Sequence, residues 1–192
     1  MAGWHSVGGM QPQEHAVGRV EQIWIYPVRS LAGTALTEAE VSAAGLVGDR
    51  AWTVTGGDGS VIRPKDAPAM REIAPSGDPA ADAERLAAVL GRAVRLLPTP
   101  DLRPDVAPVH LVSRQAVERA AAGDVPEGCS AEDPRANLML TLDGDERAWV
   151  GRELRVGKVV LRVTRTPKHC LGVYADVVTP GAVRAGDPVL LV

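Results

Sequence analysis

A succession of short β-type segments, divided by Gly, Asp and Pro, constrains the fold more than any other feature of this chain. The first is rich in Val, Ile, Trp and Tyr and stops at Pro27, as a strand should. Segments of this type cover residues 17–28, 35–41, 93–98, 109–112, 137–142, 153–156, 158–164 and 188–192. Residues 51–55 and 60–64 flank a Gly- and Asp-rich turn and are typical of a β-hairpin. About nine strands at this spacing predict a mainly β fold, a closed or nearly closed barrel, because closure removes exposed sheet edges.

Two segments are predicted to form helices, which a barrel of this size would carry on its periphery. Asp78 and Pro79 fit the N-cap and first-turn positions of a helix whose apolar residues keep helical spacing until Gly91. Ser113 can cap a second helix that ends at Gly123. The whole chain has 192 residues, enough for one domain or two small interlocked lobes.

Composition excludes several classes of partner. Hydrophobic residues make up 45% and charged residues 23%, the balance of a soluble globular protein. A net charge of -3 and 3% aromatic residues give no basic surface and few stacking platforms, so nucleic acid is not an expected partner. No apolar run reaches the roughly 18 to 20 residues of a membrane span, and residues 1–16, predicted to be a mobile tail, do not resemble a signal peptide. Two cysteines are too few for a disulfide scaffold, so we expect a cytoplasmic protein without membrane contact.

Common catalytic motifs are missing from the sequence. It contains neither a phosphate-binding GxxxxGK[ST] loop nor GxGxxG, GxSxG or HExxH, and its four histidines share no metal-ligand spacing. The remaining candidate is Cys170, whose neighbours Lys168 and His169 could lower the pKa of its thiol. The alternative is an inert, buried cysteine. Cys129 lies among acidic residues, where the inert interpretation is favoured further.

Five blocks of sequence, in order, resemble those of the MOSC family, which is named for the C-terminal domain of molybdenum-cofactor sulfurases. They are IYPVRSL, AGLVGDRAWTV followed by DGS, DPRANLML, TPKHC and the closing GVYADVVTPGAVRAGDPVLLV. The resemblance runs from Val17 to Val192 and implies a MOSC-type β-barrel with a few peripheral helices. Residues 17–97 resemble the family's N-terminal β-barrel region and 98–192 the MOSC domain itself. We expect the two to pack as one unit, because short strands need several partners.

The resemblance implies a cofactor and a reaction. In better-understood relatives the family cysteine ligates molybdenum in a pyranopterin, and Cys170 occupies the matching position, which makes it the implied metal ligand and catalytic residue. A soft thiolate suits such a metal. The implied cofactor is molybdopterin with its molybdenum, and the implied substrates are N-hydroxylated small molecules. Because no electron-donor domain is visible in the sequence, a reductase of this kind would need a separate flavin or heme protein.

The phosphate of that cofactor requires basic residues, and the family-like blocks supply candidates. Arg29, Arg50 and Lys65 stand at positions where relatives carry basic residues, and Arg135 and Asn137 match an R-x-N element beside the cofactor. The alternative for each arginine is a solvated residue at a strand end. For Arg135 and Asn137 it is a loop-to-strand turn stabilised by local hydrogen bonds.

Two departures from the family pattern leave the reaction open. His169 stands where relatives often have arginine, and the segment after Cys170 is shorter than in the reductases. The protein could therefore handle cofactor sulfur. From another class, it could be a non-catalytic carrier of a persulfide on Cys170, which thiolate chemistry permits, or a cofactor-binding module without activity.

Overall fold

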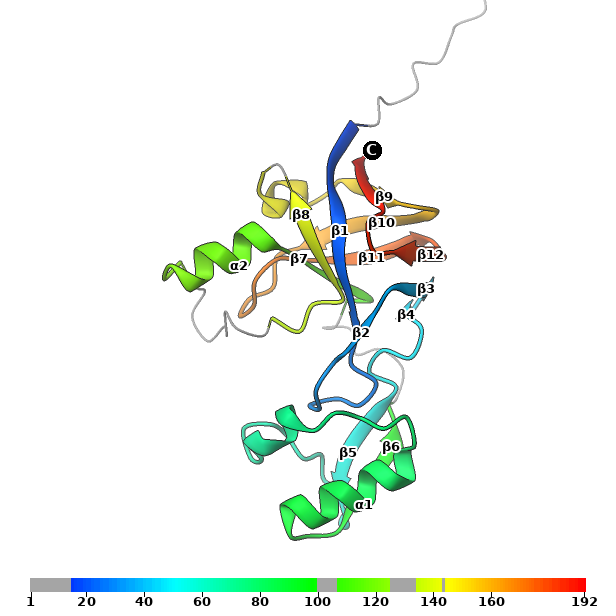
Figure 1. Ribbon diagram of the computed structural model, residues 1–192, viewed down its shortest axis with the longest axis vertical. Coiled ribbons are helices and arrows are strands. Elements are labelled where there is room, and N and C mark those ends of the chain that lie inside the picture. Colours follow the sequence, from blue (N-terminus) through cyan, green and yellow to red (C-terminus); the bar gives the residue numbers. More distant parts are fainter. Residues whose placement is uncertain (1–14, 100–106, 125–133, 143) are drawn as a thin grey trace, which may run out of the picture.

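A computed structural model describes residues 15–99, 107–124, 134–142 and 144–192 of the chain (Figure 1). Most of the predicted tail, residues 1–14, lies outside these ranges, whereas His15 and Ala16 already belong to the first strand. Among the helices of the described residues, none combines the length and apolar character needed to span a bilayer.

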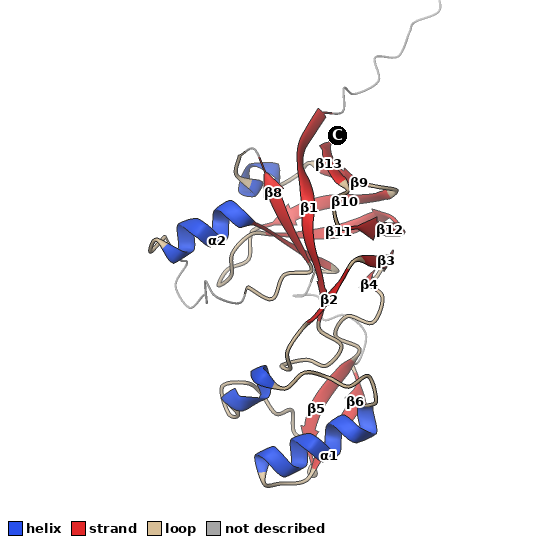
Figure 2. Ribbon diagram, in the orientation of Figure 1, coloured by secondary structure: helices blue, strands red, loops and turns tan. Residues whose placement is uncertain are grey.

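Seven strands close into a barrel, as the sequence predicts (Figure 2). In spatial order they are β13 (Pro188–Leu191), β9 (Glu153–Val156), β10 (Val159–Arg165), β11 (Val173–Thr179), β7 (Val109–Ser113), β8 (Leu138–Leu142) and β1 (His15–Ile25), with β1 pairing back onto β13. Only the β7–β8 pair is parallel among the described pairs of this sheet. Alternation along β10 turns Val159, Leu161 and Val163 inward, each essentially without exposed surface, so the interior is a packed apolar core.

Shorter elements flank the barrel. β2 (Thr34–Leu36) extends the sheet from β1, while β3 (Glu38–Ser42) and β4 (Gly45–Leu46) join β12 (Gly181–Arg184) in a small sheet. α2 (Arg114–Ala121) packs on β7 and β8, and the short helix η2 (Glu146–Trp149) follows β8. A separate cluster under α2 contains Ala116, Ala136 and Leu171.

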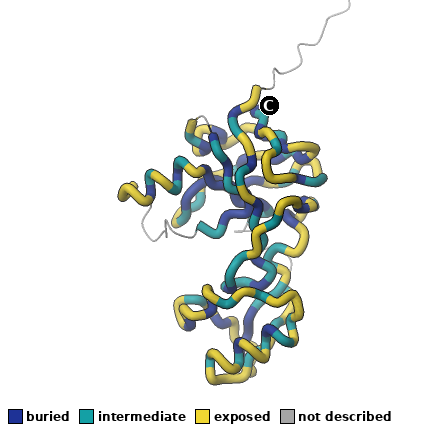
Figure 3. The backbone as a smooth tube through the Cα atoms, viewed as in Figure 1, coloured by how far each residue is buried: buried dark blue, intermediate teal, exposed yellow. Residues whose placement is uncertain are grey.

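A second lobe lies below the barrel in Figure 1 and has a core of its own. It comprises β5 (Trp52–Gly56), η1 (Pro68–Glu72), α1 (Pro79–Leu90) and β6 (Val94–Pro98). Leu86 of α1 and Met70 of η1 are fully buried here with Val54 of β5, and Val28 and Leu31 join them from the segment that leaves β1. Figure 3 shows buried backbone, in dark blue, in both the barrel and this lobe. The chain thus enters the second lobe directly from a barrel strand.

The structure confirms the predicted fold class and both helices. Asp78 accepts hydrogen bonds from the backbone N–H groups of Ala80 and Ala81, and Gly91 ends α1 in the left-handed conformation. Ser113 caps α2 by accepting from the N–H of Ala116, 2.9 Å away. β11 and β12 are strands that the sequence pattern did not predict, because exposed and buried residues alternate only over the first half of β11.

The predicted hairpin over 51–55 and 60–64 is present only in part. The N–H of Gly56 donates to the carbonyl of Ser60 at 2.8 Å and that of Ile62 to the carbonyl of Val54 at 3.0 Å, but Val61 makes an isolated bridge to Thr55 and residues 60–64 form no strand. β5 pairs instead with β6, across five residues. Pro64 has no N–H to continue a ladder, and the chain turns away to bury Met70.

We expect residues 17–97, expressed alone, to lack a cooperative unfolding transition. In that fragment β1 loses both β8 and β13, which leaves its inward residues Val17, Val20 and Ile23 without the barrel core. Thermal denaturation followed by circular dichroism, with amide chemical-shift dispersion, would test this. Dispersed amide signals and a sharp transition in the fragment would contradict the single-unit prediction.

Candidate cofactor-binding site

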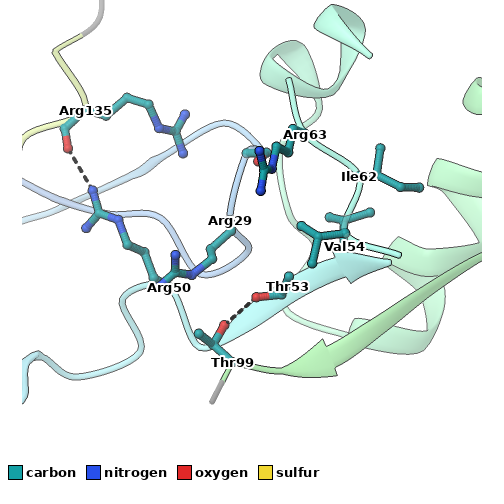
Figure 4. Close-up of a pocket in the computed structure, with 10 residues that line it drawn as sticks. Arg29, Arg50, Thr53, Val54, Ile62, Arg63, Thr99 and Arg135 are labelled. Atoms are coloured by element: carbon teal, nitrogen blue, oxygen red, sulfur yellow. Dashed lines mark hydrogen bonds between the residues drawn. The ribbon is translucent and has the colours of Figure 1, made fainter. Parts of the chain in front are cut away.

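A cavity of about 380 Å³, the arginine cavity, lies where the second lobe meets the end of β1 (Figure 4). Its walls come from the turn after β1, the segment before β5, β5 itself, the segment after the Gly-rich turn, the end of β6 and the segment before β8. The lining residues are Arg29, Ser30, Arg50, Thr53, Val54, Val61, Ile62, Arg63, Thr99 and Arg135. Among the described lining residues, four carry guanidinium groups and none carries a carboxylate, so these side chains give the cavity a positive potential.

The backbone of Arg29 is held in place because the segment after β1 pairs with the start of β5. Its N–H donates to the carbonyl of Trp52 at 2.8 Å, and the N–H of Trp52 donates to the carbonyl of Pro27 at 3.0 Å. This bridge brings the chain after β1 alongside the start of β5, so that Arg29 and Thr53 face the same cavity.

Arg50 is held by the aspartate that precedes it. One oxygen of Asp49 accepts the N–H of Tyr26 at 2.8 Å, and the other pairs with the Arg50 guanidinium. The backbone N–H of Arg50 in turn donates to the carbonyl of Tyr26 at 2.8 Å. Its other terminal nitrogen donates to the carbonyl of Arg135 at 3.1 Å (Figure 4). Arg50 therefore connects three segments that are distant in sequence.

Backbone strain concentrates at this cavity. Among the described residues other than glycine, three have a positive φ: Ser30 at 76°, Arg50 at 52° and Arg135 at 51°. All three line the arginine cavity. Left-handed backbone costs an L-residue on the order of 1 kcal/mol, and such residues gather at binding sites, where the surroundings hold them in place.

The ring of Tyr26 is the platform beneath two of the arginines. The guanidinium of Arg135 lies 4.1 Å from the ring centroid and that of Arg50 lies 5.2 Å from it. The Tyr26 ring is almost fully buried, and its hydroxyl donates to the carbonyl of Ala136 at 3.5 Å. Cation–π contacts of this kind fix the orientation of a guanidinium over an aromatic face.

The structure brings together three of the five residues predicted to bind the cofactor. Arg29, Arg50 and Arg135 line one cavity, whereas Lys65 is exposed and does not line it. Asn137 is fully buried and supports the fold: its side-chain oxygen accepts the N–H of His110 at 3.1 Å, and its amide donates to the carbonyl of Trp24 at 3.3 Å.

Arg63, Thr53 and Thr99 line the cavity but were not predicted. Arg63 is basic and lies two positions before Lys65, so in this segment the basic residue that lines the cavity is Arg63 and not the predicted Lys65. The hydroxyls of Thr53 and Thr99 share a hydrogen bond of 2.9 Å. No sequence pattern predicts this contact, because the two residues are 46 positions apart.

Cys170 lines a different cavity, of about 200 Å³, together with Arg119, Glu146 and Arg147. It is half-buried, while its neighbours Lys168 and His169 point to the exposed surface and do not line the cavity. Two guanidinium groups, those of Arg119 and Arg147, therefore line the same cavity as Cys170. Cys129 lies outside the described residues.

Carboxylates balance the two arginines of the Cys170 cavity. Arg147 pairs with Asp145 at 2.7 Å, and Arg119 lies 3.8 Å from the same carboxylate. Glu146 is fully buried and accepts from the hydroxyl and the N–H of Ser113, at 2.7 and 3.1 Å. Ser113 is thus the predicted helix cap and also the residue that anchors a buried carboxylate in this cavity.

The His110 side chain contacts one residue of each cavity: Leu171 of the Cys170 cavity and Arg135 of the arginine cavity. Its Nε2 lies 2.7 Å from the carbonyl of Leu171, and because a carbonyl only accepts, Nε2 carries the proton. The ring packs edge-on against Tyr174, with centroids 4.9 Å apart. Burial lowers the pKa of His110 to about 4, opposed by hydrogen bonds to the backbone of Leu171 and Arg135. The imidazole is therefore neutral near pH 7.

The donor set fits a phosphate-bearing cofactor and a single thiolate ligand. The arginine cavity supplies the charge for a phosphate, and Cys170 supplies a soft donor. The described residues contain no group of three or more His, Cys, Asp and Glu side chains placed to hold a metal ion by themselves.

Residues 17–117, just over half of the chain, match the family model described as the MOSC N-terminal beta barrel domain. The chain belongs to the MOSC family.

Sequence similarity to individual proteins covers a shorter part of the chain than the family model does. A segment of 58 residues is 40% identical to mitochondrial amidoxime-reducing component 1 of Homo sapiens, and 62 residues are 37% identical to component 2 of Rattus norvegicus. These matches span 28% and 30% of this chain but only 17% and 18% of the relatives' lengths. The crystal structure of the YuaD protein from Bacillus subtilis has the same fold, with a TM-score of 0.56 at 13% identity over 93% of this chain and 97% of that one.

Acid should destabilise the protein through His110. Below pH 6.5 the unfolded state protonates this histidine while the folded state does not until about pH 4, so stability falls across that window. The expected loss is about 3 kcal/mol from this residue. His110→Gln keeps a donor for Leu171 but does not titrate, and should lack this part of the loss. Urea unfolding of both proteins from pH 7.5 to 4 measures it, and parallel pH profiles would contradict the prediction.

Proposed function

We propose that the protein binds a molybdenum pterin cofactor and in that state reduces N-hydroxylated small molecules. The observation that carries the proposal is the arginine cavity, in which Arg29, Arg50 and Arg135 converge from three of the family-like blocks. The partial similarity to amidoxime-reducing components supports the choice of substrate class. A cytoplasmic location remains a prediction.

The arginines would hold the phosphate of the cofactor. Arg50 and Arg135 are oriented by Tyr26, and Arg50 is also oriented by Asp49, so little side-chain freedom is lost when an anion binds. Arg63 adds a fourth charge from the second lobe. Ligand binding would therefore also tie the second lobe to the barrel.

Cys170 would be the protein's ligand to the metal. When bound, the molybdenum cofactor supplies the exchange of electrons with the substrate. The hydrogen bond from His110 to the carbonyl of Leu171, the residue after Cys170, would anchor the loop that carries the thiolate. Reduction of an N-hydroxyl group releases its oxygen as water and consumes electrons and protons, so a separate flavin or heme protein would be the electron donor.

A second function is favoured by one observation. Cys170 lines a cavity that shares no lining residue with the arginine cavity among the described residues. This separation favours the alternative of a sulfur carrier, in which Cys170 holds a persulfide beside Arg119 and Arg147 and passes the sulfur to a cofactor. Cyanide-labile sulfur on Cys170 without bound metal would support the carrier. Pterin and molybdenum together would support the reductase.

Replacing Arg29, Arg50 or Arg135 by Ala should lower cofactor retention. Each charge-assisted hydrogen bond contributes about 1.5 to 3 kcal/mol when sheltered, which corresponds to roughly a 10- to 100-fold loss of affinity. Arg92→Ala, an exposed arginine outside the cavity, is the matched control. Molybdenum content and oxidised-pterin fluorescence of protein from a cofactor-producing host measure the effect. Folded variants that load as well as wild type would remove these residues from the site.

Cys170→Ser should abolish molybdenum binding and any reductase or persulfide chemistry while costing little in stability. Serine is close in size but lacks the soft sulfur. Cys129→Ser is the control and should change neither quantity. Metal analysis and the pH dependence of thiol alkylation distinguish the two. Full metal content in Cys170→Ser would mean that the cysteine is structural.

A further inference from the structure

Arg63 lines the arginine cavity from the side of the second lobe. Figure 4 shows it across the cavity from Arg50 and Arg135, with Arg29 between the two sides. The Arg50 guanidinium is held by Asp49 and by the carbonyl of Arg135. The Arg63 side chain is exposed and, within the described ranges, makes no hydrogen bond or ion pair. It is thus a positive charge in the cavity wall that the packing of the described residues does not require.

The backbone around Arg63 is anchored in the second lobe. The N–H of the buried Ile62 donates to the carbonyl of Val54 at 3.0 Å. The carbonyl of Arg63 accepts the N–H groups of Asp66 and Ala67, at 2.9 and 3.1 Å. Both Ile62 and Ala67 belong to the core of this lobe. Any movement of the second lobe relative to the barrel would therefore carry Arg63 with it.

The junction between the barrel and the second lobe is loosely packed. Their two hydrophobic cores share no residue among those described. Two cavities lie at the junction: the arginine cavity and a second one of about 460 Å³, which is lined by Trp24 and Met139 of the barrel and by Arg71 of η1. Closely packed interfaces hold few voids of this size, and lobes without a large apolar interface commonly move relative to each other. The junction thus leaves room for a small rotation of the second lobe.

Electrostatics would make such a rotation depend on an anion. Without one, Arg63 on one side repels Arg50 and Arg135 on the other, which disfavours their approach. A phosphate group between them attracts both sides, and the planar fork of a guanidinium can donate two parallel hydrogen bonds to its oxygens. An anion would therefore be bound most tightly in an orientation that brings the second lobe closer to the barrel.

We propose that Arg63 is a further anion-binding residue of the arginine cavity, and that it draws the second lobe toward the barrel when a phosphate group binds. Closure of one lobe onto another around a ligand is a common form of conformational change. The inference rests on the proposed function, because the expected phosphate is that of the cofactor, and it adds a moving lobe that encloses the bound group.

Calorimetric titration of the full chain with inorganic phosphate tests the role of Arg63 in binding. Arg63→Ala should weaken phosphate binding about tenfold or more, as expected for the loss of one charge-assisted contact. Arg92→Ala is the matched control, because it removes another exposed arginine of the same lobe that does not line the cavity, and it should change binding less than about twofold. Equal phosphate binding by wild type and Arg63→Ala, or no phosphate binding by wild type, would overturn the inference.

Amide residual dipolar couplings test the movement. Fitted separately for the barrel and the second lobe, they report the relative orientation of the two. In wild type and in Arg92→Ala this orientation should change when phosphate is added to saturation. In Arg63→Ala, also saturated with phosphate, it should stay as in the phosphate-free protein. An unchanged orientation in wild type, or the same change in Arg63→Ala, would contradict closure by Arg63.

Molybdenum content separates this inference from the proposed function. Wild type loaded with cofactor should already have the orientation that phosphate induces in the unloaded protein. If wild type retains molybdenum but its two lobes keep the orientation of the unloaded protein, the inference fails and the proposed function stands. If phosphate changes the orientation in an Arg63-dependent way in a protein that never retains molybdenum, the closing lobe stands and the molybdenum reductase is excluded.

Discussion

The structure depends on one strand that is hydrogen-bonded along both of its edges. β1 pairs with β13 on one side and with β8 on the other, and this double pairing closes the barrel. The close approach requires Gly18, where a Cβ would lie 2.1 Å from the carbonyl oxygen of Thr141. Because the chain passes from β1 straight into the segment that bears Tyr26 and Arg29, the closed barrel also positions one wall of the arginine cavity.

The arginine cavity has costs that the fold alone does not require. It gathers four like charges and three residues with left-handed backbone, both of which are unfavourable in the absence of a ligand. Asp49 offsets part of the charge, and Tyr26 offsets part of the desolvation through its ring. The remaining positive charge is what an anion would neutralise. A purely structural role would not explain why strain and charge occur in the same place.

The sequence predicted those features of the structure that depend on residues close together in the chain. The helix caps Asp78 and Ser113 follow from side-chain chemistry, and the barrel from the succession of strand-like segments. The partner of β5 could not be predicted, because it depends on Pro64 ending one ladder and on Met70 needing a core. Likewise Arg63 and the role of Asn137 depend on which segments meet in space. The resemblance to a family indicated three of the four arginines of the cavity, and only the structure revealed the fourth, Arg63.

A series of hydrogen bonds connects the arginine cavity to the residue that follows Cys170. Arg50 donates to the carbonyl of Arg135, and two residues later the side chain of Asn137 accepts the backbone N–H of His110. The ring of His110 then donates to the carbonyl of Leu171, adjacent to Cys170. The side chains of Asn137 and His110 in this path are buried, and burial keeps the imidazole neutral near pH 7, so their hydrogen bonds do not change with protonation there. These contacts connect Arg50, in the wall of the arginine cavity, to the residue that follows Cys170.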